Sequence, residues 1–328
     1  MVLLPGILAV GKGGELRVLI TGGAGFIGSH VCDALLATGA TVYCVDNYLT
    51  GRPQNIQHLS SHPRFHFTDV DVSQSIPDVD VDRIYHLASP ASPVGYQRYP
   101  IETLRVNSLG TFNCLELAYR KSARFLLVST SEIYGDPLEH PQEETYWGNV
   151  NPIGPRSMYD EGKRFAEAAT VSYVDTRGID GRIVRIFNTY GPRNDPQDGR
   201  LMPTLITQAL TGQPLAVFGS GRQTRSFCYV DDLVRGLIAA MEVDDAKREV
   251  FNLGNPDERP IIEYAEIIQR LSGTDSSVIH VEDRPEEIQR RCPDISKARQ
   301  RLAWSPQVAI EDGLRVTISW FREEVCKH

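Results

Sequence analysis

Tyr159 and Lys163 are the pair in this sequence best suited to acid–base chemistry. They begin and end the segment YDEGK, inside a stretch with helical periodicity over residues 158–177. Residues four apart lie on one face of a helix, so the ammonium can approach the phenol. A phenol that acts as a base near neutral pH must lose roughly 3 pKa units, about 4 kcal/mol, and nearby positive charge acts in that direction. Because the same pattern also occurs on solvated helix faces, it needs support from elsewhere in the chain.

That support comes from VSTSEIYG at residues 128–135, directly after a predicted strand at 124–129. Thr130 in this segment can hydrogen-bond a substrate hydroxyl group that Tyr159 deprotonates, and Glu132 adds a carboxylate two residues later. We therefore predict that these segments meet around a hydroxylated substrate.

A second group of residues predicts a nucleotide site. Gly22, Gly25 and Gly28 have G-x-x-G-x-x-G spacing in TGGAGFIG, between a predicted strand and a predicted helix, with Phe26 and Ile27 before the last glycine. Glycines at such a turn let backbone N–H groups approach a pyrophosphate at a helix N-terminus. The alternative is an ordinary glycine turn.

The next predicted strand favours the dinucleotide interpretation. It ends at Asp46, 18 residues after Gly28, followed by Asn47. A carboxylate there accepts hydrogen bonds from ribose hydroxyls and repels a 2′-phosphate, so NAD is favoured over NADP. Asp71 and Val72, after the third strand, are predicted to bracket the adenine.

The elements that must position these residues alternate between strand and helix. Strands are expected at residues 17–21, 41–46, 64–70, 83–88, 124–129 and 180–188, and helices at 27–38, 103–121 and 158–177. This alternation predicts an α/β fold, a Rossmann-type doubly wound parallel sheet with helices on both faces.

The second half of the sequence has a different residue pattern. Polar turn formers follow Gly191, then helical and strand-like runs, and mainly helical periodicity from Ile262 onward. We expect an NAD-binding domain over residues 15–189 with a return segment near 227–256. A smaller, discontinuous substrate domain would then occupy mainly residues 190–325, with the active site in the crevice between them.

Composition limits the partners. The 328 residues are 41% hydrophobic and 23% charged, and 34 basic against 42 acidic residues give a formal charge of −8. An acidic chain without a basic block predicts no binding of nucleic acid or anionic membranes. No apolar run is long enough to span a bilayer, and residues 1–15 are expected to form a loose tail.

The six cysteines are scattered, without a C-x-x-C pair. We interpret them as small buried thiols rather than metal ligands or disulfides, which predicts no metal site and a reducing, cytoplasmic compartment.

The combined motifs resemble the extended short-chain dehydrogenases/reductases and, more narrowly, the UDP-glucuronate decarboxylases. The resemblance runs from about residue 16 to the end of the chain, and its most specific segments are HLASPASP (86–93), STSEIYGDPLEHPQ (129–142), YWGNVNPIGPRS (146–157), RIFNTYGPR (185–193) and GRQTRSF (221–227). Met158 and Cys292 depart from that family, which tends to have Cys and Lys there.

One position discriminates within the superfamily. This chain has Thr130-Ser131-Glu132, whereas related dehydratases typically read Thr-Asp-Glu and use the Asp as the acid for water loss. Glu without that Asp, together with Arg291 in RRCPDI, fits the decarboxylases. The alternative for Arg291 is a plain surface charge.

The resemblance also implies site residues. The catalytic set is Thr130, Glu132, Tyr159, Lys163 and Arg291. Lys163 and Tyr159 also contact NAD, as do Leu87, Ala88, Ser89 and Asn107. The implied substrate contacts are Tyr96, Glu102, Ser131, Asn188, Leu201, Val217, Phe218, Arg225 and Arg291, although Leu201, Val217 and Phe218 could equally be core residues.

The implied reaction converts UDP-glucuronate into UDP-xylose. C4 is oxidised while Tyr159 takes the hydroxyl proton, the 4-keto acid loses CO₂ to give an enolate, and C4 is then reduced again. Rivals are an enzyme that stops at the UDP-4-keto-pentose, another sugar-nucleotide epimerase or dehydratase, and a non-catalytic protein that keeps the dinucleotide fold. The resemblance further implies a homodimer formed by a helix bundle that includes residues 103–121 and the Tyr159 helix.

Overall fold

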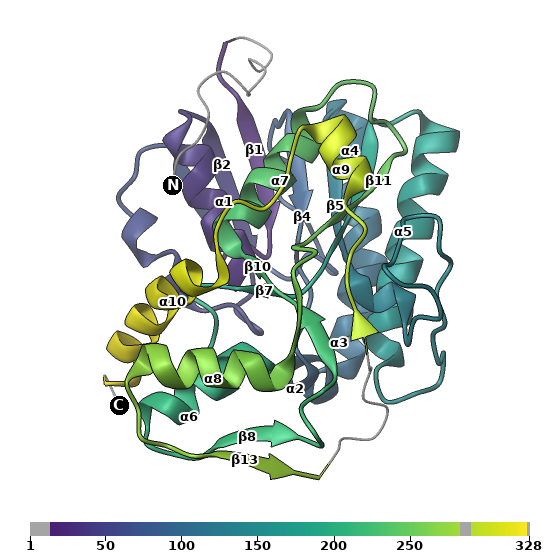
Figure 1. The fold of residues 1–328 in the computed structure, drawn as a ribbon. Helices are drawn as coiled ribbons and strands as arrows, with labels where there is room; N and C mark the ends of the chain where they lie inside the picture. Colours follow the sequence, from purple (N-terminus) through teal and green to yellow (C-terminus); the bar gives the residue numbers. More distant parts are fainter. Residues whose placement is uncertain (1–13, 283–289, 327–328) are drawn as a thin grey trace.

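A seven-stranded parallel sheet forms the centre of the computed structural model, which describes residues 14–282 and 290–326 (Figure 1). Its spatial order is β11-β6-β5-β4-β1-β2-β3. The strands are β1 (Arg17–Thr21), β2 (Thr41–Asp46), β3 (Phe65–Asp69), β4 (Arg83–His86), β5 (Arg124–Thr130), β6 (Gly181–Ile186) and β11 (Val250–Leu253). The predicted doubly wound α/β fold is confirmed, and nearly all of the expected tail at 1–15 lies outside the described residues.

Both faces of the sheet are buried, because successive side chains of a strand point in opposite directions. In β1, Val18 and Ile20 belong to the core cluster that includes α1 (Phe26–Ala37). Leu19 points the other way, into the cluster that includes α4 (Thr111–Lys121). This explains why the strands appear in the sequence as continuous apolar runs.

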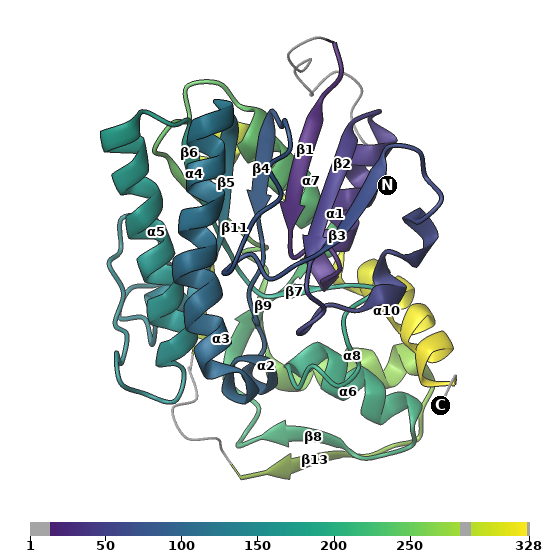
Figure 2. The same cartoon turned by 180° about the vertical axis from the view of Figure 1, so that it is seen from behind.

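Helices cover the two faces as separate layers. α1 and α7 (Val230–Glu242) lie on one face (Figure 1), and the other carries α4 and α5 (Ser157–Arg177) (Figure 2). The helix expected at 103–121 begins earlier, at α3 (Pro100–Arg105), and passes through a π-helical turn at Val106–Gly110 before α4. Proline suits the start of α3 because its missing N–H would have no helical partner there.

The second half of the chain builds a layer beyond the carboxyl ends of the strands (Figures 1 and 2). Its helices are α6 (Leu201–Leu210), α8 (Ile261–Ser272) and α10 (Ile310–Val325). Its small sheets pair β7 (Thr189–Tyr190) with β10 (Cys228–Tyr229), β8 (Leu215–Phe218) with β13 (Val278–Val281), and β9 (Thr224–Ser226) with both β12 (Glu258–Pro260) and β14 (Arg290–Arg291). Short helices in the first half complete the fold: α2 (Pro93–Arg98) and 3₁₀ turns at Pro53–Asn55, Gln57–Leu59 and Ser131–Tyr134.

One late segment returns to the central sheet. α9 (Ser296–Leu302) packs against β11 and α7. Trp304 donates a hydrogen bond from Nε1 to the Asp232 carbonyl oxygen at 2.8 Å, so this part of the chain is anchored to α7. Within residues 14–282 and 290–326, we find no helix with the length and apolar character needed to cross a membrane.

Candidate active site

A cavity of about 530 Å³ opens at the carboxyl ends of the sheet strands, against the layer built by the second half of the chain. Ligands bind at this edge in open α/β sheets. All the residues predicted from the sequence to form the site line this cavity, except Asn107 and Val217. The structure thus brings together segments as distant in sequence as the glycine loop and Arg291.

The glycine loop at one end of the cavity is tightly wound. Gly22 adopts a left-handed φ of 72° and donates a backbone hydrogen bond to the Val45 carbonyl oxygen at 2.8 Å. A Cβ atom on Gly28 would lie 2.1 Å from the Gly22 carbonyl oxygen. Only glycine permits this close turn, which leaves the N-terminus of α1 open to the cavity and fits a pyrophosphate.

Asp46 lies buried at the end of β2, where the ribose contact is expected. Its carboxylate accepts hydrogen bonds from the backbone N–H groups of Ala24 at 3.0 Å and Tyr48 at 2.8 Å. Burial raises the pKa of Asp46, while these N–H groups act in the opposite direction. The carboxylate is therefore fixed in orientation. The nearby lining residues Asn47 and Asp71 each accept a local turn hydrogen bond.

Asn107 is not among the residues that line the cavity, and its expected contact with the cofactor stays a prediction. It lies fully buried in the π-helical turn. Its side-chain amide donates to Ser89 Oγ at 2.9 Å and to the Thr103 carbonyl oxygen at 2.8 Å. Since Ser89 lines the cavity, Asn107 acts as a support behind a lining residue.

Tyr159, near the start of α5, is buried at the centre of the cavity wall. Its ring stacks on that of Tyr96, with 5.3 Å between the ring centroids and 11° between the planes. Burial raises the pKa of Tyr159 to about 12, and hydrogen bonding to Thr130 and the positive charge of Arg200 oppose that rise. The expectation that the protein lowers this pKa is therefore not met by its own groups, because desolvation outweighs them.

Lys163 follows one turn later on the same helix face and is also buried. Its ammonium donates to the Val128 carbonyl oxygen at 2.9 Å. Burial lowers the pKa of Lys163 to about 8, and the charge of Glu167 opposes the shift. A lysine in this state is charged near neutral pH but close to its titration range.

Glu132 lies between two arginines. Thr130 caps the 3₁₀ turn by accepting a hydrogen bond from the Glu132 N–H at 3.2 Å. One carboxylate oxygen of Glu132 pairs with Arg156 and the other with Arg291, which is only 3% exposed. The structure therefore excludes the alternative that Arg291 is a plain surface charge.

The opposite end of the cavity holds the predicted nucleotide contacts. Arg225 on β9, Asn188 after β6, and Leu201 at the start of α6 all line the cavity. Phe218 lines it too, whereas Val217 is fully buried, which favours the core alternative for Val217. The two residues are neighbours on β8, and side chains alternate across a strand, so only one of them can face the site.

Sequence analysis missed several lining arginines, and two of them, Arg156 and Arg200, contact carboxylates in the cavity wall. Arg156 lies in the quoted segment YWGNVNPIGPRS, but nothing in its spacing shows that it meets Glu132. Arg200 lies among the turn formers after Gly191, where Asp198 holds its guanidinium in a two-pronged contact at 2.5 and 2.7 Å. Charged loop residues carry no periodic signal, so their place in the site depends on tertiary structure.

Comparison with known families matches most of the chain. Residues 19–317 match the family model described as GDP-mannose 4,6 dehydratase. The chain is 50% identical over 309 residues to UDP-glucuronic acid decarboxylase 1 of Xenopus tropicalis, covering 94% of this chain and 73% of that protein. It is equally similar over 309 residues to UDP-glucuronic acid decarboxylase 6 of Arabidopsis thaliana, covering 94% of this chain and 89% of that protein.

Solved structures share the same fold. UDP-glucuronic acid 4-epimerase from Bacillus cereus, in complex with UDP-glucuronic acid and NAD, is 31% identical with a TM-score of 0.85, covering 94% of this chain and all of that one. UDP-glucose 4-epimerase from Thermotoga maritima, solved with UDP-glucose, is 29% identical with a TM-score of 0.84, covering 94% and 100%. Together with the architecture and the motifs around the cavity, these similarities show that the chain belongs to the UDP-glucuronic acid decarboxylase family of extended short-chain dehydrogenases/reductases.

Proposed function

We propose that this protein decarboxylates UDP-glucuronate to UDP-xylose, with NAD as a cofactor that is regenerated in each turnover. The observation that carries the proposal is the Glu132 carboxylate between Arg156 and Arg291, in the same cavity as Tyr159 and Thr130. Relatives 50% identical over most of the chain are named UDP-glucuronic acid decarboxylases, which supports it.

The glycine loop and Asp46 would hold NAD at one end of the cavity. Two features support the fit: the turn that a Cβ at Gly28 would fill, and the carboxylate of Asp46 fixed by backbone N–H groups. When bound, NAD supplies a hydride acceptor for C4 of the sugar, a positive ring beside Tyr159, and the hydride that is returned at the end.

Tyr159 and Thr130 would act on the C4 hydroxyl group. Thr130 orients the hydroxyl, and Tyr159 takes the hydroxyl proton while C4 is oxidised by loss of its hydride. Because the protein alone raises the pKa of Tyr159 to about 12, positive charge is needed beside the phenol. Arg200 contributes charge of that sign from the cavity wall, and the ammonium of Lys163 would add to it.

The two arginines would receive the uronate carboxylate. Guanidinium groups bind carboxylates with paired hydrogen bonds, and both arginines already pair with a carboxylate in this cavity. Once C4 is a ketone, the C5–C6 bond breaks, CO₂ leaves, and the electron pair passes into the carbonyl as an enolate. The hydroxyl groups of Tyr159 and Thr130 stabilise that oxyanion, and Glu132 positions the ring or the water that protonates C5.

The experiment is product analysis by NMR after incubation with UDP-glucuronate, with and without added NAD. We expect CO₂ and UDP-xylose in both cases, since a cofactor regenerated in place need not be supplied. Glu132→Gln should bind NAD normally but release CO₂ much more slowly.

Three outcomes would contradict the proposal. UDP-galacturonate with no CO₂ would favour an epimerase, the activity named for the similar Bacillus cereus structure. UDP-4-keto-pentose with stoichiometric NADH would favour an enzyme that stops after decarboxylation. Unchanged CO₂ release by Glu132→Gln would remove that residue from its role.

We also propose that residues 15–189, with a return segment near 227–256, bind NAD, and that mainly residues 190–325 bind the UDP-sugar. The position of β11 in the central sheet supports the return segment. Arg225, Phe218 and Leu201 support the second assignment, because all three line the nucleotide end of the cavity.

A second copy of the chain is the partner that we propose for the α3–α4–α5 face. Large apolar side chains are exposed along it: Ile101, Leu104, Leu109, Phe112, Tyr119 and Phe165. A contiguous apolar surface on helices favours burial against matching helices, and a two-fold axis supplies them from an identical chain.

For the compartment, we propose the reducing cytoplasm. The six cysteines all lie in the described ranges and are free, and five of them are buried. Free thiols persist where glutathione and thioredoxin keep them reduced.

A further inference from the structure

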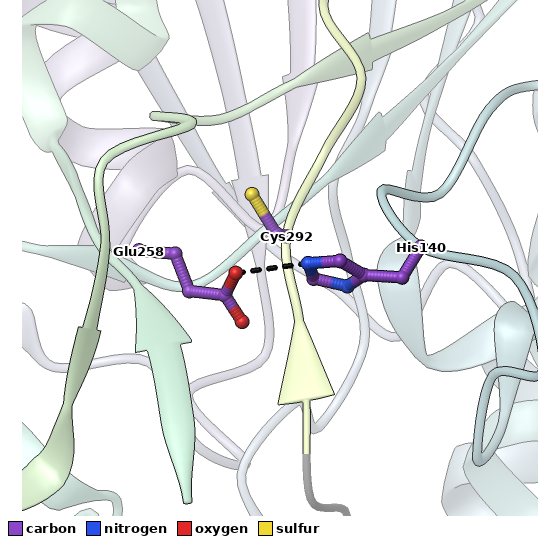
Figure 3. Close-up of side chains that lie close together, drawn as sticks. All are labelled: His140, Glu258 and Cys292. Carbon is purple, nitrogen blue, oxygen red and sulfur yellow. Dashed lines mark hydrogen bonds and ion pairs between the residues drawn. The ribbon is translucent and has the colours of Figure 1, made fainter.

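Three side chains of different chemistry converge outside the active-site cavity. His140, Glu258 and Cys292 each present a ligand atom, and these atoms all lie within 4.8 Å of one another (Figure 3). The imidazole Nε2 lies 2.9 Å from Glu258 Oε2. None of the three lines the candidate active site.

The chain segments that carry these donors are already joined. The Gln142 N–H donates to the Cys292 carbonyl oxygen at 2.9 Å, and the Cys292 N–H donates to the Gln142 side chain at 2.9 Å. These bonds tie the loop of His140 to the segment after β14. Glu258 begins β12, which pairs with β9, and β9 pairs in turn with β14. The donors therefore lie on a preformed frame.

The carboxylate is also oriented. Thr224 Oγ1 donates to Glu258 Oε1, which leaves Oε2 directed at His140. Arg290 carries a charge that would oppose a cation here, and its Nε lies 3.8 Å from Glu258 Oε1, the oxygen that is not bonded to His140. Arg290 is more than half exposed, so it can turn into solvent.

We propose that His140, Glu258 and Cys292 form a site for a divalent transition-metal ion, Zn²⁺ being the ion that fits this donor set. Imidazole nitrogen, carboxylate oxygen and thiolate sulfur are the ligands that zinc takes in proteins. Three protein ligands leave a fourth position for water. Ligand atoms around tetrahedral zinc lie about 3.5 Å apart, so His140 Nε2 and Glu258 Oε2, now 2.9 Å apart, must move apart by about 0.5 Å, while the other separations, all within 4.8 Å, adjust to the same spacing by side-chain rotation.

Binding would displace a proton from the thiol. Cys292 Sγ now makes a weak contact with the Pro256 carbonyl oxygen at 3.5 Å. Burial raises the pKa of Cys292 to about 12, and the Glu258 carboxylate acts in the same direction. A metal cation reverses that balance, so the thiolate forms as the metal binds and the proton passes to solvent. Zinc affinity should therefore rise with pH.

Zinc would act as a clamp near Arg291, the residue immediately before Cys292. It would link β12, the segment after β14, and the His140 loop through one ion. Because the unfolded chain does not hold these donors together, zinc should stabilise the folded state and raise the melting temperature.

The test is titration of the full, tag-free, reduced protein with Zn²⁺, followed by calorimetry and thermal melting. We expect one high-affinity Zn²⁺ per chain and a higher melting temperature. Co²⁺ in place of Zn²⁺ should give a thiolate charge-transfer band in the near ultraviolet. Loss even of groups that only support a metal ligand costs about 10–100-fold in affinity, so His140→Ala and Cys292→Ser should each weaken binding by roughly a hundredfold or more.

Cys326→Ser is the matched control, because Cys326 is an exposed free thiol away from the site. It should leave affinity and stoichiometry unchanged. Metal-free melting curves of every variant show whether the fold is intact, and Glu258→Gln, which keeps an oxygen for Thr224, serves if Cys292→Ser unfolds. Absence of Zn²⁺ binding to the wild-type protein, equal affinity in the folded variants, or a Co²⁺ spectrum without a thiolate band would each overturn the proposal.

Discussion

At the scale of the residue, burial shifts the pKa values of Tyr159 and Lys163, the pair that the sequence predicts for acid–base chemistry. The pKa of Tyr159 rises to about 12 and that of Lys163 falls to about 8, so desolvation disfavours the charged form of both. Lys163 keeps its charge at neutral pH, so its burial is costly to the folded state, whereas Tyr159 is neutral there and bears no such cost. An apolar residue in place of Lys163 should therefore increase the free energy of unfolding and abolish activity.

We predict that Lys163→Met makes the protein more stable and inactive. The difference between the ordinary lysine pKa and about 8 corresponds to about 3 kcal/mol, from which the lost bond to Val128 removes about 1 kcal/mol. The free energy of unfolding at pH 7 should thus rise by roughly 2 kcal/mol. Urea denaturation measures it.

The pH dependence of the free energy of unfolding is a second test of the same variant. Below pH 8 both folded and unfolded chains hold the Lys163 proton, so the wild type bears the full cost. Between about pH 8 and 10.5 the folded chain releases its proton first, and wild-type stability rises relative to the variant. Lys247→Met is the control, since this exposed lysine also donates to a backbone carbonyl. A variant that is less stable than wild type at pH 7 would refute the argument.

At the scale of the element, the strand–turn–helix unit depends on close backbone contact. A Cβ at Gly28 would lie 2.1 Å from the Gly22 carbonyl oxygen and 2.8 Å from the Gly23 Cα. Backbone atoms cannot rotate away as a flexible side chain can, so any larger residue must reshape the turn.

We predict that Gly28→Ala lowers NAD affinity by at least about tenfold and destabilises the fold by roughly 1–3 kcal/mol. Gly236→Ala provides the contrast, because its Cβ would collide with Leu253 and Trp304 in the core, away from the cavity. That variant should melt earlier yet bind NAD normally. NAD titration and thermal melting of both variants test this prediction. Equal NAD affinity in the two variants would contradict it.

At the scale of the whole molecule, the proposed dimer gives the α3–α4–α5 face a partner. Leu109 is 51% exposed in the π-helical turn, between the exposed side chains of Leu104 and Phe112. Burying such a side chain contributes about 1.5–3 kcal/mol per copy, and a buried unpaired carboxylate would cost more.

We predict that Leu109→Glu shifts the protein from dimer to monomer in analytical ultracentrifugation. Val316→Glu on α10 is the matched control, since Val316 is 52% exposed on a different face. It should leave the sedimentation unchanged. A monomeric wild type, or a Leu109→Glu protein that sediments as the wild type does, would argue against the dimer.

The sequence by itself determined the sheet, the glycine loop and the Tyr159–Lys163 pair, because each is encoded within a short segment. Apolar runs and turn glycines specify local structure, and a spacing of four places two residues on one helix face. Asp46 could be predicted for the same reason, since a strand end fixes its position.

Only the tertiary structure decided which distant groups meet. In the structure, Glu132 pairs with Arg156 and Arg291. Asn107 and Val217 do not line the cavity. His140, Glu258 and Cys292 lie together in one cluster. The tertiary structure also set the pKa of Tyr159, because burial is a property of the packed chain. Contacts between separate loops and strands, here 24 and 159 positions apart for Glu132, arise from packing of the whole chain, and no local pattern in the sequence encodes them.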